Sequence, residues 1–199
     1  MFYFIAGVLL IWRSLLFLFS FLGGVLLAFK PTFPYSDIYL ISSGLPDWVW
    51  SFANFDGVHY LTIAKNGYSA QFTQVFFPLF PIIINILHRI FPIINPIIIG
   101  LFISNLFFLF TCLVFYKLLK LDYKNDVVRW GIIFLCFLPT SFFYGSLYTE
   151  SLFLFLIIAA FYAARKKFWW LAGALGGLAS ATRFVGIFLL PALLWEWHE

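Results

Sequence analysis

The sequence predicts an all-α membrane protein, a polytopic bundle of transmembrane helices. Hydrophobic residues make up 64% of the 199 residues and charged residues only 10%, whereas soluble domains average roughly 45–50% and about 25%. Several apolar runs reach the length of about 20 residues that a helix needs to cross the hydrocarbon core. A soluble globule could not cover its surface with so few charges, which excludes cytosolic enzymes and nucleic-acid-binding proteins. We therefore treat residues 1–199 as a single membrane domain.

The first predicted span runs from Phe4 to Phe29 and is interrupted only by Arg13, which we expect to snorkel toward water. No basic stretch precedes this run, so we expect an uncleaved helix rather than a signal peptide. Residues 30–75 then form the one long polar stretch, an outer loop in which we expect amphipathic helices. This loop is poor in Lys and Arg, so the positive-inside rule places it outside and the N-terminus inside.

Two basic clusters, residues 117–129 and Arg165–Lys167, mark the cytoplasmic side. Because the outer loop precedes the first cluster, an odd number of crossings must join them. The proline-bounded run 76–91 is therefore expected to be an interfacial or re-entrant helix that does not cross. The expected crossings after it are Ile93–Tyr116, Trp130–Pro139 and Ser151–Ala164, followed by a last apolar stretch, Phe168–Trp197.

This topology brings three chemically unusual residues, Asp56, Glu150 and Arg183, to the outer side. Glu150 stands at the start of an expected span, where a helix N-terminus would favour a carboxylate without any functional role. Arg183 lies in the middle of the last apolar stretch, and the helix rise brings it toward the same side. An arginine there costs several kcal/mol unless it is paired, hydrated or able to snorkel. Each residue thus has a structural and a functional interpretation.

A short helix is expected over residues 57–65, ended by an Asn-Gly pair. Asp56, His59 and Tyr60 are spaced at i, i+3 and i+4 and therefore share one helix face. A carboxylate, an imidazole and a phenol on an amphipathic helix at the membrane surface could form a site. Asp56 could equally be only an N-cap that accepts backbone N–H bonds.

Metal and disulfide chemistry is not expected. Cys112 and Cys136 lie inside apolar runs and predict packed thiols. The sequence contains no metal-ligand spacing. We therefore expect neither a metal nor another cofactor.

Four blocks in order resemble the signature of the GPI mannosyltransferase II family. They are Phe55–Tyr68, Phe76–Pro81, Phe137–Ser151 and Ala179–Arg183. The first block resembles the family pattern W-D-x-x-H-[YF], with Phe55 in place of Trp. The chain resembles the N-terminal half of family members, so the resemblance implies half of a GT-C-like membrane module.

The resemblance implies a GT-C glycosyltransferase, an inverting enzyme that takes its sugar from a polyprenyl-phosphate carrier on the outer or lumenal leaflet. It assigns the role of catalytic base to Asp56. It also suggests that Arg183 contacts the lipid phosphate and that Glu150, His59 and Tyr60 contribute to substrate binding.

The expected function is therefore mannose transfer from a polyprenyl- or dolichyl-phosphate donor to a lipid- or glycan-linked acceptor. The alternatives are a non-catalytic subunit that scaffolds a partner in a glycan-assembly complex and, less favoured, a lipid or solute transporter, which should show broken helices in matched halves. Membrane lipids are expected partners and nucleic acid is not. The expected location is the plasma membrane in a prokaryote and the endoplasmic reticulum membrane in a eukaryote.

Overall fold

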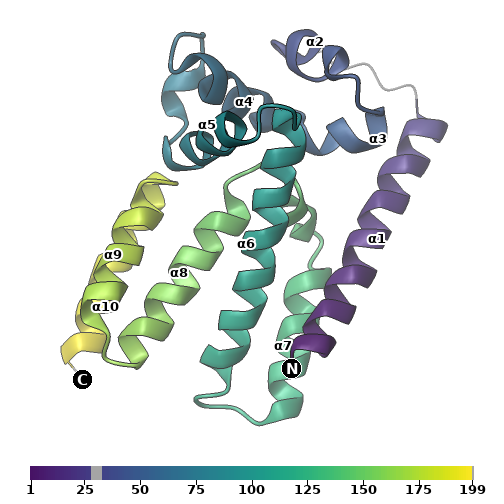
Figure 1. The fold of residues 1–199 in the computed structure, drawn as a ribbon. Coiled ribbons are helices and arrows are strands. Elements are labelled where there is room, and N and C mark those ends of the chain that lie inside the picture. Colours follow the sequence, from purple (N-terminus) through teal and green to yellow (C-terminus); the bar gives the residue numbers. More distant parts are fainter. Residues whose placement is uncertain (28–32, 199) are drawn as a thin grey trace.

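Helices form all the regular secondary structure in the described part of the chain, residues 1–27 and 33–198 of this computed structural model. Figure 1 shows long helices standing side by side, with the shorter α2 to α5 gathered over one end. We call that end the upper end and the opposite end, where both chain termini lie, the lower end. The bundle consists of α1 (Phe2–Leu26), α6 (Pro96–Leu119), α7 (Asn125–Phe137), α8 (Glu150–Arg165), α9 (Trp169–Ser180) and α10 (Leu189–His198).

The upper end is built from short helices of the expected outer loop and its continuation. The α-helices are α2 (Ser36–Tyr39), α3 (Asp47–Trp50), α4 (Asp56–Asn66) and α5 (Leu79–Ile90). The 3-10 helices are η1 (Ile41–Ser43), η2 (Ser51–Ala53) and η3 (Thr73–Val75), with η4 (Ser141–Gly145) and η5 (Phe184–Phe188) later in the chain.

Two helices, α1 and α6, have the length and apolar character to cross a membrane, with 25 and 24 residues. They correspond to the first expected span, whose last residues Ala28 and Phe29 lie outside the described part, and to the expected span Ile93–Tyr116. The helices α7 and α8 contain 13 and 16 residues, fewer than the roughly 20 that span the hydrocarbon core. The crossings expected at Trp130–Pro139 and Ser151–Ala164 therefore stay predictions.

The two basic clusters lie at the same end of the bundle, as the sequence predicted. The chain runs down α6, up α7 and down α8, so the turns after α6 and α8 both lie at the lower end (Figure 1). There Arg165 pairs with Asp122 of the α6–α7 turn at 2.8 Å, which joins the two basic clusters. The helix α5, from the proline-bounded run, packs against α4 at the upper end and does not descend the bundle.

The last apolar stretch, Phe168–Trp197, is not a single helix. It is divided into α9, η5 and α10, and α10 turns back beside α8 so that Glu196 lies 3.4 Å from Arg165 at the lower end. The turn needs a glycine at position 186, because a Cβ there would lie 2.5 Å from the backbone nitrogen of Ser180. Arg183 occupies this turn at the upper end, where an ion pair can form.

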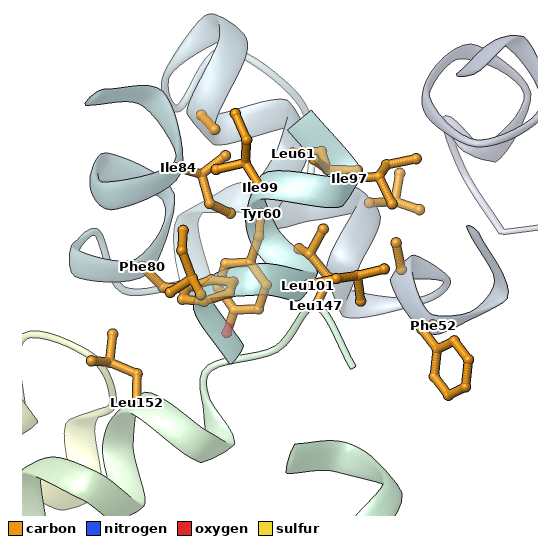
Figure 2. Close-up of a cluster of buried hydrophobic side chains, with 14 of the residues drawn as sticks. Phe52, Tyr60, Leu61, Phe80, Ile84, Ile97, Ile99, Leu101, Leu147 and Leu152 are labelled. Carbon is orange, nitrogen blue, oxygen red and sulfur yellow. The ribbon is translucent and has the colours of Figure 1, made fainter. Parts of the chain in front are cut away.

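The core of the upper end surrounds α4. Figure 2 shows Tyr60 and Leu61 of α4 packed with side chains of α5, α6 and the loop that carries Leu147. Every residue from Gly57 to Ala64 is buried. The expected helix over 57–65 is confirmed, and it ends where Gly67 takes a φ of 67°. Its expected amphipathic character is wrong, because residues of α5 and the start of α6 help to bury all its faces from Gly57 to Ala64, whereas its position at the membrane surface stays a prediction.

Candidate functional site

A cavity of about 270 Å³ opens at the upper end between α4, η3, the start of α8 and the α9–η5 turn. We call it the Asp56 cavity. Its lining residues are Asp56, Tyr60, Val75, Phe76, Phe77, Thr149, Glu150, Thr182, Arg183, Phe184 and Val185. The structure thus brings together four of the five residues that the sequence proposed for a site.

Asp56 is the first residue of α4 and not its N-cap. The cap position belongs to Phe55, and no side chain caps the helix. Phe55 has φ 55° and ψ −121°, a conformation that costs a non-glycine residue of order 1–3 kcal/mol and persists where the surroundings enforce it. The Asp56 side chain is exposed. It accepts no hydrogen bond from the described residues, 1–27 and 33–198. The N-cap interpretation is therefore wrong, and within the described residues no hydrogen-bond donor occupies the Asp56 carboxylate.

Three hydrogen bonds hold the loop before Glu150 against the segment that carries Asp56. The Leu147 amide donates to the Phe52 carbonyl at 2.8 Å. The Tyr148 hydroxyl donates to the Asn54 carbonyl at 2.9 Å, and the Tyr60 and Thr149 hydroxyls lie 3.3 Å apart. Contacts between residues some 90 positions apart in the chain thus fix both carboxylates at one cavity.

Gly57 permits this close approach. A Cβ at position 57 would lie 3.2 Å from the Leu147 carbonyl oxygen, which belongs to backbone and cannot rotate away. The glycine between Asp56 and the buried body of α4 is therefore part of the packing that brings the first and third motif blocks together.

Glu150 and Arg183 form an ion pair across the cavity. The Arg183 Nη1 atom lies 2.7 Å from Glu150 Oε1, and the two side chains are 42% and 26% exposed. This pairing stabilises the arginine, so snorkelling is not required. A guanidinium has five N–H donors, and among the described residues only Glu150 accepts from it. The second carboxylate oxygen, Oε2, is buried and has no hydrogen-bond partner in the same part of the chain.

Tyr60 and His59 differ in their relation to the cavity. Tyr60 lines it, and burial raises the pKa of its phenol to about 12, so it remains a neutral hydrogen-bonding group. His59 does not line it, contrary to expectation. Its buried ring packs between Phe33 and Phe76, with ring centroids 5.1 and 4.8 Å away. Burial lowers the pKa of His59, partly offset by Asp56. His59 therefore supports the cavity wall through Phe76.

Comparison with known proteins identifies the family of the chain. A family profile described as Mannosyltransferase (PIG-V) matches residues 5–193. The chain belongs to the PIG-V mannosyltransferase family. It is therefore a membrane protein of a family of mannosyltransferases, as its two long apolar helices and its composition indicate.

Two curated relatives are both named GPI mannosyltransferase 2. The protein from Drosophila pseudoobscura pseudoobscura is 28% identical over 134 residues, which cover 62% of this chain and 28% of the relative. The protein from Schizosaccharomyces pombe is 30% identical over 140 residues, covering 69% of this chain and 30% of the relative. The chain thus matches less than one third of the length of either relative. No solved structure matches the chain.

Arg13 is a residue of this PIG-V chain whose role the sequence did not indicate correctly. It does not snorkel. Its Nη1 atom donates to the Gly145 carbonyl at 2.8 Å, and its guanidinium carbon lies 4.1 and 4.5 Å from the ring centroids of Phe17 and Phe52. Arg13 thereby fixes the end of η4, from which the chain continues to Glu150. Its position inside an apolar run could have indicated a partner within the protein, because a charge in a membrane span is costly unless it is paired.

We expect Arg13→Met to destabilise the protein by about 2 kcal/mol, because it removes a charge-assisted hydrogen bond and leaves a buried carbonyl without a partner. In a chain of this size that corresponds to a fall of roughly 4–8 °C in melting temperature, measurable by thermal unfolding in detergent. Arg129→Met, at an exposed lower-end position, is the matched control. Equal shifts in the two variants would contradict the positioning role.

No cluster of His, Cys, Asp and Glu that could hold a metal occurs in the described ranges 1–27 and 33–198. Cys112 and Cys136 are buried free thiols of the apolar core, away from the Asp56 cavity. The expectation of a metal-free site stays a prediction.

Proposed function

We propose that the Asp56 cavity transfers mannose from a polyprenyl- or dolichyl-phosphate carrier to a lipid- or glycan-linked acceptor, with inversion at the anomeric carbon. The observation that carries the proposal is that an exposed carboxylate, Asp56, and an arginine, Arg183, lie in the wall of one cavity. A site on the outer or lumenal side of the membrane suits a lipid-linked donor, because the carrier's prenyl chain holds the sugar at the membrane surface.

In the proposed reaction, an acceptor hydroxyl attacks the anomeric carbon and Asp56 takes its proton as the new bond forms. The bond from that carbon to the phosphate oxygen breaks, and its electron pair leaves with the polyprenyl phosphate. This leaving group is already anionic, so it needs positive charge rather than a general acid. A guanidinium matches phosphate oxygens bidentately, which is the role we assign to Arg183.

Asp56 and Glu150 would not act as an acid–base pair of the kind that glycoside hydrolases use. We propose instead that Glu150 orients Arg183 through their 2.7 Å contact. Its unpartnered oxygen, Oε2, suits a sugar hydroxyl, because a buried acceptor without a donor is costly until a ligand supplies one.

The rest of the wall fits the remaining parts of the donor. Tyr60 and Thr149 present hydroxyl groups to the cavity. Phe184 and Val185 are 64% and 50% exposed and continue the cavity wall to the outside of the bundle. We assign the first prenyl units of the carrier to this apolar surface.

The proposal is tested in proteoliposomes that contain the purified chain, radiolabelled polyprenyl-phosphate mannose and a lipid-extract acceptor. We expect label to enter the acceptor from the lipid-linked donor and not from GDP-mannose. Donor binding is measured in parallel. Transfer from GDP-mannose would contradict the proposed donor class. If the protein neither transferred mannose nor bound the donor, the result would favour a non-catalytic subunit.

A further inference from the structure

A second and larger cavity, of about 500 Å³, lies at the upper end on another face of α4. It is enclosed by α2, η1, α4, α5 and the first turn of α6. Its basic lining residues are Lys65, His88 and Arg89, and none of the described lining residues is acidic. We call it the Lys65–Arg89 cavity. Asp56 and Tyr60 do not line it, so it is separate from the proposed transfer site.

Within the described residues no carboxylate neutralises the cations of this cavity, although the Lys65 ammonium lies 5.8 Å from the centroid of the Tyr39 ring. Elsewhere Arg165 pairs with Asp122 and Glu196, and Arg183 pairs with Glu150. In contrast, Lys65 and Arg89 form no ion pair with any residue in 1–27 or 33–198. Two cations at a concave, partly enclosed surface concentrate positive potential and attract an anion.

Hydrogen bonds join the elements that enclose the cavity. Asn95 donates to the Ser43 carbonyl at 3.1 Å, and Asn85 donates to the Ala64 carbonyl at 2.5 Å. The Asn95 side chain also caps the start of α6. The positive end of that helix's dipole adds to the charge of the cavity.

The chain on either side of Arg89, from α5 to the first turn of α6, carries exposed apolar side chains. Six residues there are exposed, with Ile93 at 99%: Ile86, Ile90, Phe91, Ile93, Ile94 and Ile98. Large exposed aliphatic side chains are unfavourable in water and favourable among acyl chains. Cations directly next to such a surface are the arrangement of a segment at the headgroup level of a bilayer. A free anion would use the cations and leave the apolar surface uncovered.

We propose that the Lys65–Arg89 cavity binds the phosphodiester headgroup of an anionic glycerophospholipid, whose acyl chains lie against Ile90, Ile93 and Ile94. The lipid phosphate pairs with Lys65 and Arg89. Because Lys65 is in the last turn of the helix that begins at Asp56, the bound lipid anchors α4 from a face other than the one that lines the Asp56 cavity. This proposal rests on the membrane character of the chain and not on the proposed transfer reaction.

The test is native mass spectrometry of the purified protein titrated with phosphatidylglycerol or phosphatidylcholine. We expect the wild-type protein to retain phosphatidylglycerol preferentially. The double variant Lys65→Gln/Arg89→Gln should bind it roughly ten- to thirty-fold more weakly, since each basic residue near anionic lipid contributes about 1 kcal/mol. The conservative variant Lys65→Arg/Arg89→Lys should retain the preference and shows that the fold tolerates changes at both positions.

The matched control is Lys124→Gln/Arg129→Gln, which removes the same charge from exposed positions at the lower end. An equal loss of phosphatidylglycerol in the control and the test variant would overturn the proposal in favour of nonspecific charge. A second arm adds inorganic phosphate as a competitor. Displacement of the lipid by millimolar phosphate would overturn it in favour of a site for the free anion.

Discussion

Replacing Asp56 by asparagine is expected to lower sugar transfer by about 10²–10⁴-fold, the usual contribution of a general base. Asparagine has nearly the same shape but cannot take the proton of the acceptor hydroxyl. The carboxylate is exposed, does not cap α4 and accepts no hydrogen bond within the described residues. We therefore expect Asp56→Asn to leave expression and melting temperature unchanged.

The measurement is the turnover of Asp56→Asn protein in the proteoliposome assay, with its melting temperature recorded in the same detergent. Asp37→Asn is the matched control, because Asp37 is another exposed aspartate of the same outer loop and does not line the Asp56 cavity. Turnover near the wild-type value in Asp56→Asn would remove Asp56 from catalysis. Glu150 would then be the remaining carboxylate in the cavity.

Arg183→Ala is expected to reduce transfer by about 10²–10³-fold, the loss that follows removal of one preorganised donor from a developing anion. The same change breaks the ion pair with Glu150, so it also leaves a part-buried carboxylate without its partner. The loss of activity alone therefore does not separate phosphate binding from a structural role.

Arg183→Lys makes that separation. Lysine keeps a positive charge that can pair with Glu150, but it cannot hold a phosphate bidentately. We expect a normal melting temperature and a raised KM for the lipid-linked donor, with the acceptor KM unchanged. A wild-type donor KM in Arg183→Lys, together with a lowered melting temperature in Arg183→Ala, would leave Arg183 with the ion pair as its only role.

Local patterns in the sequence predicted much of the secondary structure. Apolar runs long enough for a bilayer correctly predicted α1 and α6. The helix that carries Asp56 ends where the Asn-Gly pair indicated, because glycine readily adopts the positive φ of a helix end. The alternation of basic clusters and polar segments also predicted which turns share one end of the bundle. Four of the five residues that the sequence proposed for a site line the Asp56 cavity.

The sequence did not show which apolar side chains face other helices, because lipid-facing and core-facing residues are equally apolar in a membrane protein. The helix α4 was expected to be amphipathic, whereas residues of α5 and the start of α6 help to bury every residue from Gly57 to Ala64. His59 was expected in the site because it shares a helix face with Asp56 and belongs to the first motif block, but its ring packs against Phe33 and Phe76 and does not line the cavity.

By itself, then, the sequence determined the helical class, the long apolar spans and the residues able to do chemistry, since these depend on composition and on spacing within a few turns. Only the tertiary structure decided how the charges inside the apolar stretches are satisfied. Arg183 meets Glu150 where the last stretch breaks and turns back, and Arg13 meets the Gly145 carbonyl. A buried charge must find a partner, and that partner can lie anywhere along the chain that packing brings within reach.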